Sequence, residues 1–143
     1  MISYSSRVTI DRPPEAVFPY LVEPAKQARW PDVPMRLLTA GPLGAGSRMA
    51  LTLGKGPMQA RLTLELSAVE PDRRLTFRTL SGPIDWDGEY RLSPSGTGGT
   101  EVAQEGRLRF KGLWRLLEPM AGAEISRGEV AELERLKAAV EAD

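Results

Sequence analysis

The sequence predicts an α+β fold in which a curved antiparallel sheet of about seven strands wraps around one long C-terminal helix. Three observations support this prediction. Apolar and polar residues alternate along residues 2–10 and through most of residues 49–110, which is typical of strands with one buried face. Apolar residues in 113–140 recur instead at intervals of three and four, as in an amphipathic helix. Prolines near residues 13 and 24 predict two short helices after the first strand.

The N-terminal elements follow from this alternation and from the prolines. We predict a strand at residues 2–10 and a helix at 13–22, because the proline pair suits a first helical turn. A second helix is predicted from Pro24 to about residue 29, and Pro31 ends it.

The middle of the chain predicts a meander of antiparallel strands. Turn sequences rich in glycine and proline separate its alternating segments. Each segment has one apolar face and one polar face, as expected when only one side of the sheet is buried. The five clearest strands are predicted at residues 49–53, 58–68, 75–79, 84–92 and 102–110.

The last element is predicted as one helix from about residue 119 to 141. Pro119 suits its first turn, and 1.5 Å per residue makes it about 35 Å long. Gly122 and Gly128 each weaken a helix by about 1 kcal/mol relative to alanine. Their presence indicates either close packing or a pliable segment in the first half of the helix.

Composition excludes several kinds of chemistry. The 143 residues suit a single domain covering 1–143, and the 19 basic and 19 acidic side chains balance. With no histidine and no cysteine, the chain lacks a Ser-His-Asp triad, a thiolate nucleophile and the usual zinc ligands. We expect no metal and no cofactor, while a site of oxygen ligands or a carboxylate acid or base with a shifted pKa stays open.

The same composition limits the expected cellular location and binding partners of the protein. Balanced charge argues against a nucleic-acid partner, which usually requires a basic surface. No segment is apolar enough for a membrane span, and the first twelve residues do not resemble a signal peptide. We expect a cytoplasmic protein that is a monomer or a weak homodimer.

Several segments together resemble the START-like (SRPBCC) superfamily, which includes bacterial polyketide cyclase/dehydratase-like proteins and lipid-transfer domains. The resemblance spans nearly the whole chain and implies a helix-grip fold with a hydrophobic ligand cavity between the sheet and the last helix. The segments that carry it are VTIDRPPEAVFPYLVEPAKQARW (8–30), PLGAGSRMALTL (42–53), VEPDRRLTFR (69–78), GGTEV (98–102) and LERLKAAVE (133–141).

Residues on the predicted inward faces are the candidates for contact with such a ligand. Most are apolar or aromatic, and a few carry polar groups that can orient a bound molecule. The same spacing also describes an ordinary filled core. The candidates are Trp30, Met49, Leu51, Leu62, Leu64, Phe77, Thr79, Trp86, Tyr90, Gln104, Met120, Ala121 and Glu124. Inward-facing Gly88 and Gly106 either leave room for a ligand or kink the strands.

The same alternation places the carboxylates. Asp85, Asp87 and Glu89 share the outward face of their strand, which predicts a solvated surface paired with arginines. Glu124 lies near the apolar stripe of the last helix, where burial would raise its pKa and suit it to a general-acid role. The alternative for Glu124 is an ordinary position on the helix surface.

Three functions are compatible with these observations. The first is non-catalytic binding or transport of a hydrophobic small molecule, lipid or polyketide-like, which the missing histidine and cysteine favour. The second is a polyketide cyclase/dehydratase-type enzyme that uses Tyr90, Gln104 and Glu124.

The third function is a protein-interaction module with a filled core. It predicts an exposed apolar patch, either at Leu113 and Trp114 or around residues 31–38.

Overall fold

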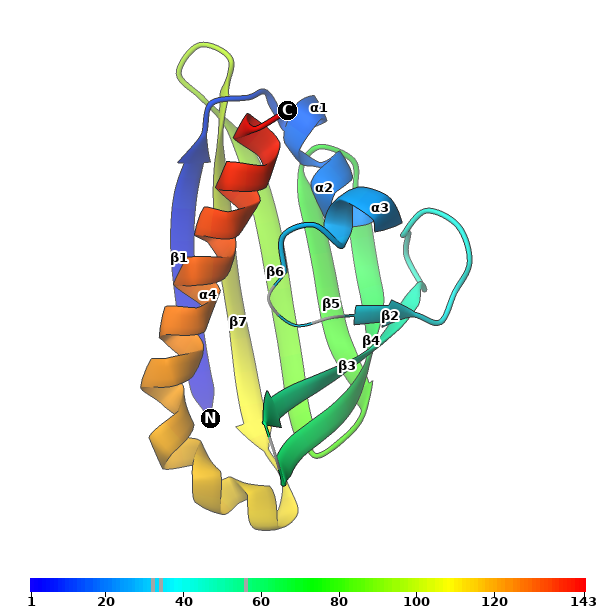
Figure 1. Cartoon of the computed structure of the whole chain (residues 1–143), viewed down its shortest axis with the longest axis vertical. Coiled ribbons are helices and arrows are strands. Elements are labelled where there is room, and N and C mark those ends of the chain that lie inside the picture. The colour runs from blue at the N-terminus through cyan, green and yellow to red at the C-terminus, as the bar shows by residue number, and fades with distance from the viewer. Residues whose placement is uncertain (32, 34, 56) are drawn as a thin grey trace.

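The computed structural model describes residues 1–31, 33, 35–55 and 57–143, which form a seven-stranded antiparallel sheet against one long helix (Figure 1). The strand order is β1-β7-β6-β5-β4-β3-β2, so the first strand pairs with the last. The strands are β1 (Ile2–Ile10), β2 (Met35–Leu37), β3 (Arg48–Lys55), β4 (Met58–Glu70), β5 (Arg74–Ser81), β6 (Ile84–Ser95) and β7 (Gly99–Phe110). The helices are α1 (Pro14–Val17), α2 (Pro19–Val22), α3 (Pro24–Gln27), the 3₁₀ helix η1 (Gly112–Leu117) and α4 (Glu118–Glu141).

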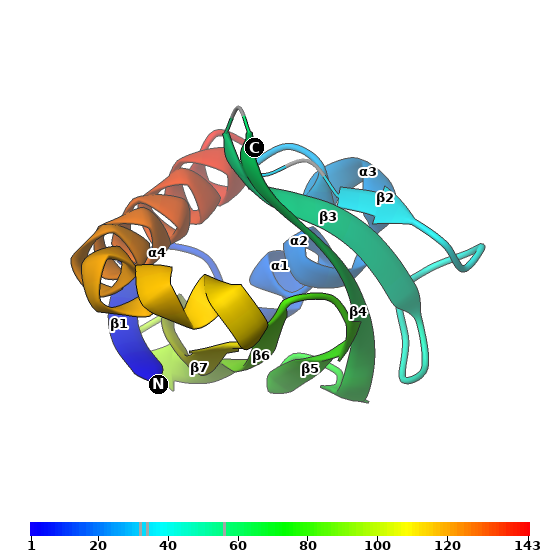
Figure 2. The same cartoon turned by 90° about the horizontal axis from the view of Figure 1, so that it is seen from below.

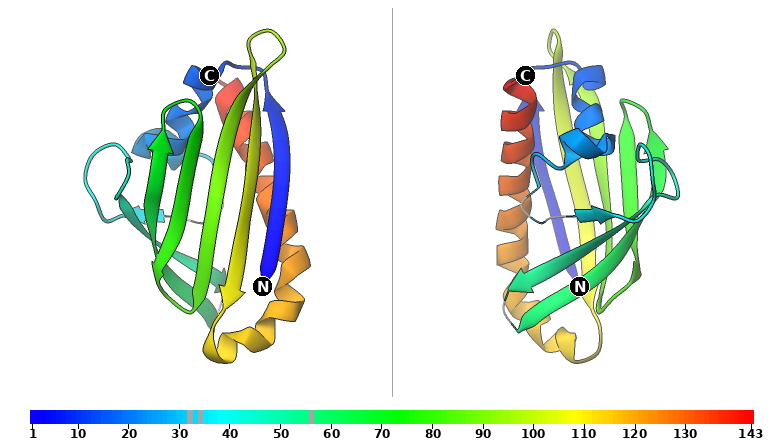
Figure 3. Two further views of the ribbon diagram at one scale, coloured as in Figure 1. Left: turned by 180° about the vertical axis from the view of Figure 1, so that it is seen from behind. Right: turned by 45° about the vertical axis from the view of Figure 1, so that its right-hand side comes forward.

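The sheet bends around a concave face. Seen from below, it curls from β1 through β7, β6 and β5 to β3, with α4 along the β1 side (Figure 2). The short helices α1 to α3 cover one end of the concave face, and η1 lies at the other end (Figures 1 and 3). This arrangement confirms the predicted fold class, including the long C-terminal helix and the short helices after the first strand.

Proline accounts for the main difference near the N-terminus. The helix predicted at residues 13–22 is two short helices, α1 and α2, because Pro19 has no N–H to continue the first one. The next helix, α3, ends at Gln27 rather than near residue 29. The three-residue strand β2 and the 3₁₀ helix η1 were not predicted.

The C-terminal half of α4 holds the helix on the sheet. Leu133, Leu136 and Val140 are almost completely buried. The guanidinium of Arg12 donates a hydrogen bond to the carbonyl of Glu141, and α4 packs mainly against β1. The N-terminal half packs less closely, because its apolar residues Ala121 and Ile125 are only half-buried. Its first residue, Glu118, accepts hydrogen bonds from the Phe110 amide and the N-terminal amine of Met1. No helix in the described part of the chain has both the length and the hydrophobicity to cross a bilayer.

Two facing glycines on β6 and β7 make room for aromatic rings rather than for a ligand. Gly88 pairs directly with Gly106 in the sheet. A Cβ on Gly88 would strike the Phe77 ring, and a Cβ on Gly106 would strike the Tyr4 ring. Of the two roles considered for these glycines, room for a ligand is therefore excluded, because aromatic rings occupy the space. The helical glycines Gly122 and Gly128 differ from these sheet glycines, because a Cβ on either would meet nothing within 4 Å.

We expect Gly88→Ala to lower the free energy of unfolding by about 1–3 kcal/mol, because the new methyl group must displace the buried Phe77 ring. Urea unfolding measures this. The matched control is Gly122→Ala, which should raise stability by up to about 1 kcal/mol, because it improves helix propensity without a clash. A Gly88→Ala protein as stable as wild type would contradict the close packing.

Candidate functional site

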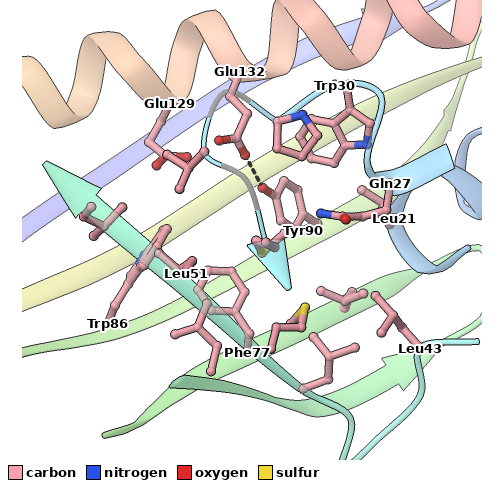
Figure 4. A pocket seen from close by; sticks show the side chains of 18 residues that line it. Leu21, Gln27, Trp30, Leu43, Leu51, Phe77, Trp86, Tyr90, Glu129 and Glu132 are labelled. Carbon is pink, nitrogen blue, oxygen red and sulfur yellow. Dashed lines mark hydrogen bonds between the residues drawn. The ribbon is translucent and has the colours of Figure 1, made fainter. Parts of the chain in front are cut away.

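An apolar cavity of about 110 Å³ lies between the concave face of the sheet, the α2–α3 helices and α4 (Figure 4). Half of its lining residues are leucine, methionine and aromatic side chains from β3 to β6. Its polar lining groups are fewer and include Gln27, Tyr90, Glu129 and Glu132. Such a mixture of apolar walls and a few polar groups is typical of small-molecule sites.

A wider groove of about 420 Å³ adjoins this cavity toward η1. The two spaces share the lining residues Val33, Leu53, Trp86, Glu129 and Glu132. Trp114 of η1 lines the groove only. The groove follows the less closely packed N-terminal half of α4, so it offers the cavity a route to solvent.

Aromatic pairs give the cavity rigid walls. The rings of Trp30 and Tyr90 meet edge to face at 6.1 Å between centroids, and Phe77 and Trp86 do so at 5.0 Å. The Trp30 indole N–H donates to the carbonyl of Tyr20 at 2.7 Å, and that of Trp86 donates to the Tyr4 hydroxyl at 2.9 Å. Both indole N–H groups are therefore already hydrogen-bonded within the protein.

Two glutamates of α4 bring carboxylates into the cavity. Glu129 and Glu132 are three residues apart, and both line the cavity and the adjoining groove. The Tyr90 hydroxyl donates a hydrogen bond to Oε1 of Glu132 at 2.7 Å (Figure 4). Gln104 of β7 donates to the backbone carbonyl of Glu129 at 2.8 Å, which ties this turn of the helix to the sheet.

Burial of these groups disfavours their charged forms. The pKa of Glu129 is raised to about 8, first by burial and then by the negative charge of Glu132. Burial, followed by the same charge, raises the pKa of Tyr90 well above its ordinary value. Near neutral pH, Glu129 is therefore mostly protonated, and a protonated carboxyl can both donate and accept a hydrogen bond.

The structure brings seven of the predicted ligand-contact residues to the cavity. Two others, Ala121 and Glu124, line the groove. The seven that line the cavity are Trp30, Met49, Leu51, Leu64, Phe77, Trp86 and Tyr90.

The remaining four predicted residues lie elsewhere. Leu62 is buried in the core without lining the cavity, and Met120 is 73% exposed. The Thr79 hydroxyl makes two hydrogen bonds to the backbone of Trp86. Gln104 is buried, and its amide donates to Ser6 and to the Glu129 carbonyl, so it is a satisfied core amide.

Of the two positions considered for Glu124, the structure shows the helix surface, and other carboxylates enter the cavity. Glu124 is exposed on the rim of the groove. Glu129 and Glu132 lie four and seven residues after Ile125, which is the helical spacing of the buried stripe. That spacing was a usable signal in the sequence. Gln27 on α3 carried no such signal, because its burial depends on the helix packing over the cavity.

In the described part of the chain, no group of three or more aspartate or glutamate side chains could hold a metal ion. The two glutamates on α4 are a pair rather than such a group. The arrangement instead provides hydrogen-bonding and proton-transferring groups at one side of an apolar space.

The sequence matches the family described as "Polyketide cyclase / dehydrase and lipid transport" over residues 1–141. No curated protein matches it.

Solved structures share the whole fold at low sequence identity. The crystal structure of TTHA0849 from Thermus thermophilus has a TM-score of 0.80 and 18% identity, with 98% of this chain and 97% of that chain covered. The Zhui aromatase/cyclase from Streptomyces sp. R1128 has a TM-score of 0.74 and 18% identity, with 97% and 93% covered.

DynU16, titled a putative protein in the dynemicin biosynthetic locus, has a TM-score of 0.71 and 19% identity. Its match covers 99% of this chain but 48% of that one. At these identities the similarity establishes the fold alone.

We expect the free energy of unfolding to decrease between about pH 5 and pH 8 because of Glu129. The raised pKa means that the folded protein keeps a proton that the unfolded chain releases at lower pH. This stabilisation is complete below the ordinary carboxyl pKa and is lost as the pH rises through about 8. The slope is at most about 1.4 kcal/mol per pH unit.

Urea unfolding of wild type and Glu129→Gln across this pH range measures the effect. The variant should lose most of the slope, because glutamine does not titrate. Glu134→Gln is the matched control, since Glu134 is exposed on the same helix. Equal slopes in wild type and Glu129→Gln would show that Glu129 does not titrate in this way.

Proposed function

Because the chain belongs to the polyketide cyclase/dehydrase and lipid transport family, we propose that it binds a largely hydrophobic small molecule in the cavity under α4. This membership confirms the START-like resemblance of the sequence. The observation that supports binding most directly is the cavity itself, walled by leucine, methionine and aromatic side chains. Apolar space of this kind loses dispersion contacts when it is empty, and an apolar ligand restores them.

The polar groups support a ligand with one polar end. Glu129, Glu132 and Tyr90 lie together along α4 and β6, whereas Leu43, Leu51 and other apolar residues line the rest of the cavity. A molecule with a hydrophobic body and a hydrogen-bonding end matches this division. The groove beside η1 provides its route of entry.

We expect the purified protein to bind the neutral hydrophobic dye N-phenyl-1-naphthylamine saturably, with enhanced dye fluorescence. Leu53→Trp should weaken binding about tenfold or more, because Leu53 lies where cavity and groove meet and the larger ring occupies that junction. Leu113→Trp is the matched control, since Leu113 is 85% exposed and lines neither space.

Thermal unfolding of both variants checks that each remains folded. Equal dye binding by Leu53→Trp and wild type would place the dye outside the cavity. Absence of saturable binding by wild type, together with no ligand in native mass spectra of the purified protein, would contradict the binding function.

A second candidate is acid–base catalysis of a cyclisation or dehydration. The observation that favours it is Glu129, whose pKa of about 8 suits a general acid near neutral pH, with Glu132 and Tyr90 in the same cavity. The solved aromatase/cyclase that shares this fold supports the same reaction class. In this candidate Glu129 takes the role that the sequence suggested for Glu124.

For this candidate we expect turnover of a poly-β-keto thioester to fall about 10²–10⁴-fold in Glu129→Gln, since the transferable proton is lost. The wild-type rate should fall as the pH rises through about 8, because the acid form disappears. Product analysis by liquid chromatography and mass spectrometry measures both. A rate in Glu129→Gln equal to that of the exposed control Glu134→Gln would exclude a catalytic Glu129.

A further inference from the structure

The charged groups of the inner cavity have one sign. Among the described residues that line it, the charged side chains are Glu129 and Glu132, and no lysine or arginine lines it. Arg135 of α4 lines the outer groove and donates from Nε to the carbonyl of Trp30 at 2.9 Å. An ionised carboxylate only accepts hydrogen bonds. A ligand group that donates hydrogen bonds therefore suits these carboxylates when they are ionised, and a negative charge there is repelled.

Gln27 adds a neutral polar group to the lining of the cavity. The residue is 7% exposed and its amide is directed into the cavity (Figure 4). Buried amides in folded proteins are nearly always paired. A polar group on a bound molecule can also pair with Gln27. Gln27 is uncharged and lies on α3, whereas the two glutamates lie on α4.

Aromatic rings beside the carboxylates indicate which hydrogen-bond donor of a ligand the cavity favours. Trp30 and Tyr90 meet edge to face next to Glu132, and Trp86 lines both the cavity and the groove. The faces of such rings attract organic cations, and a desolvated site strengthens this attraction. A hydroxyl group of a ligand can donate a hydrogen bond to the carboxylates, but it is attracted less strongly to the ring faces. An ammonium group can donate hydrogen bonds to the carboxylates and is also attracted to the ring faces.

We propose that the cavity binds an amphiphile whose polar end is a protonated amine, held by Glu129 and Glu132, with its hydrophobic body against Leu51 and Phe77. This inference rests on the proposed binding function and specifies the ligand class. A charge-assisted hydrogen bond to a carboxylate is roughly twice as strong as a neutral one. Amines are therefore favoured over alcohols of equal length, and fatty-acid anions are disfavoured by like charge.

Binding of a cation is coupled to a proton. The groups that face Glu129 are Tyr4 of β1, Tyr90 of β6, and Glu132 and Arg135 of α4, while Gln104 of β7 is neutral. With its pKa near 8, Glu129 holds a proton at pH 7 in the empty cavity. A bound ammonium favours the ionised carboxylate, so this proton is released. Affinity for the amine is therefore about tenfold higher at pH 9 than at pH 7.

The experiment compares three ten-carbon probes by displacement of N-phenyl-1-naphthylamine at pH 9. Decylamine is then mostly an ammonium ion, since alkyl amines titrate near pH 10, decanol is neutral and decanoate is an anion. Wild type should bind decylamine about tenfold more tightly than decanol, and decanoate least tightly. Glu132→Gln and Glu129→Gln should each lose most of the preference for the amine while keeping their affinity for decanol.

The control variant is Glu134→Gln, which removes the same charge from the exposed side of α4 and should keep the full preference. Equal affinity for decylamine and decanol, or an amine preference that survives in both cavity variants, would overturn the amine assignment while leaving hydrophobic binding intact. If none of the three probes displaces the dye and the dye itself does not bind, the binding function fails as well.

Discussion

The cavity depends on how α4 is fastened to the sheet. Leu133, Leu136 and Val140 are buried against the sheet, and Arg12 reaches back to the carbonyl of Glu141. These contacts hold one half of the helix tightly and leave the other half, toward η1, only partly covered. A helix packed closely along one half over a bent sheet leaves a space beneath the other half, and the cavity and groove occupy that space.

The position of the anchor also determines which side chains lose contact with water. Glu129 and Glu132 lie just before the anchored turns, so they are carried under the helix rather than out to solvent. A leucine at either position would stabilise the contact with the sheet by burying more apolar surface. Instead, the protein desolvates two acidic groups, which raises the pKa of Glu129. Such local destabilisation is common at functional sites, where binding or chemistry needs the buried group.

Much of the fold could be predicted because the signals are local. Alternation along β4, β6 and β7 identifies strands with one buried face, and the three- and four-residue spacing after Leu113 identifies α4. Less was predictable where distant contacts decide the outcome. The strand β2 has three residues and exists through its pairing with β3. Gly88 and Gly106 looked like empty positions, but rings from β5 and β1 cover them.

For the site, the sequence by itself determined the available chemistry: without histidine or cysteine, the polar groups are carboxylates, amides and phenols. It also determined that the inward strand faces are apolar. The tertiary structure alone decided which carboxylate enters the cavity. Glu124 and Glu129 are five residues apart on one helix, yet the first is exposed and the second is half-buried and lines the cavity. The reason is that burial depends on what packs opposite a side chain, and that depends on where the sheet and the α2–α3 helices come to lie.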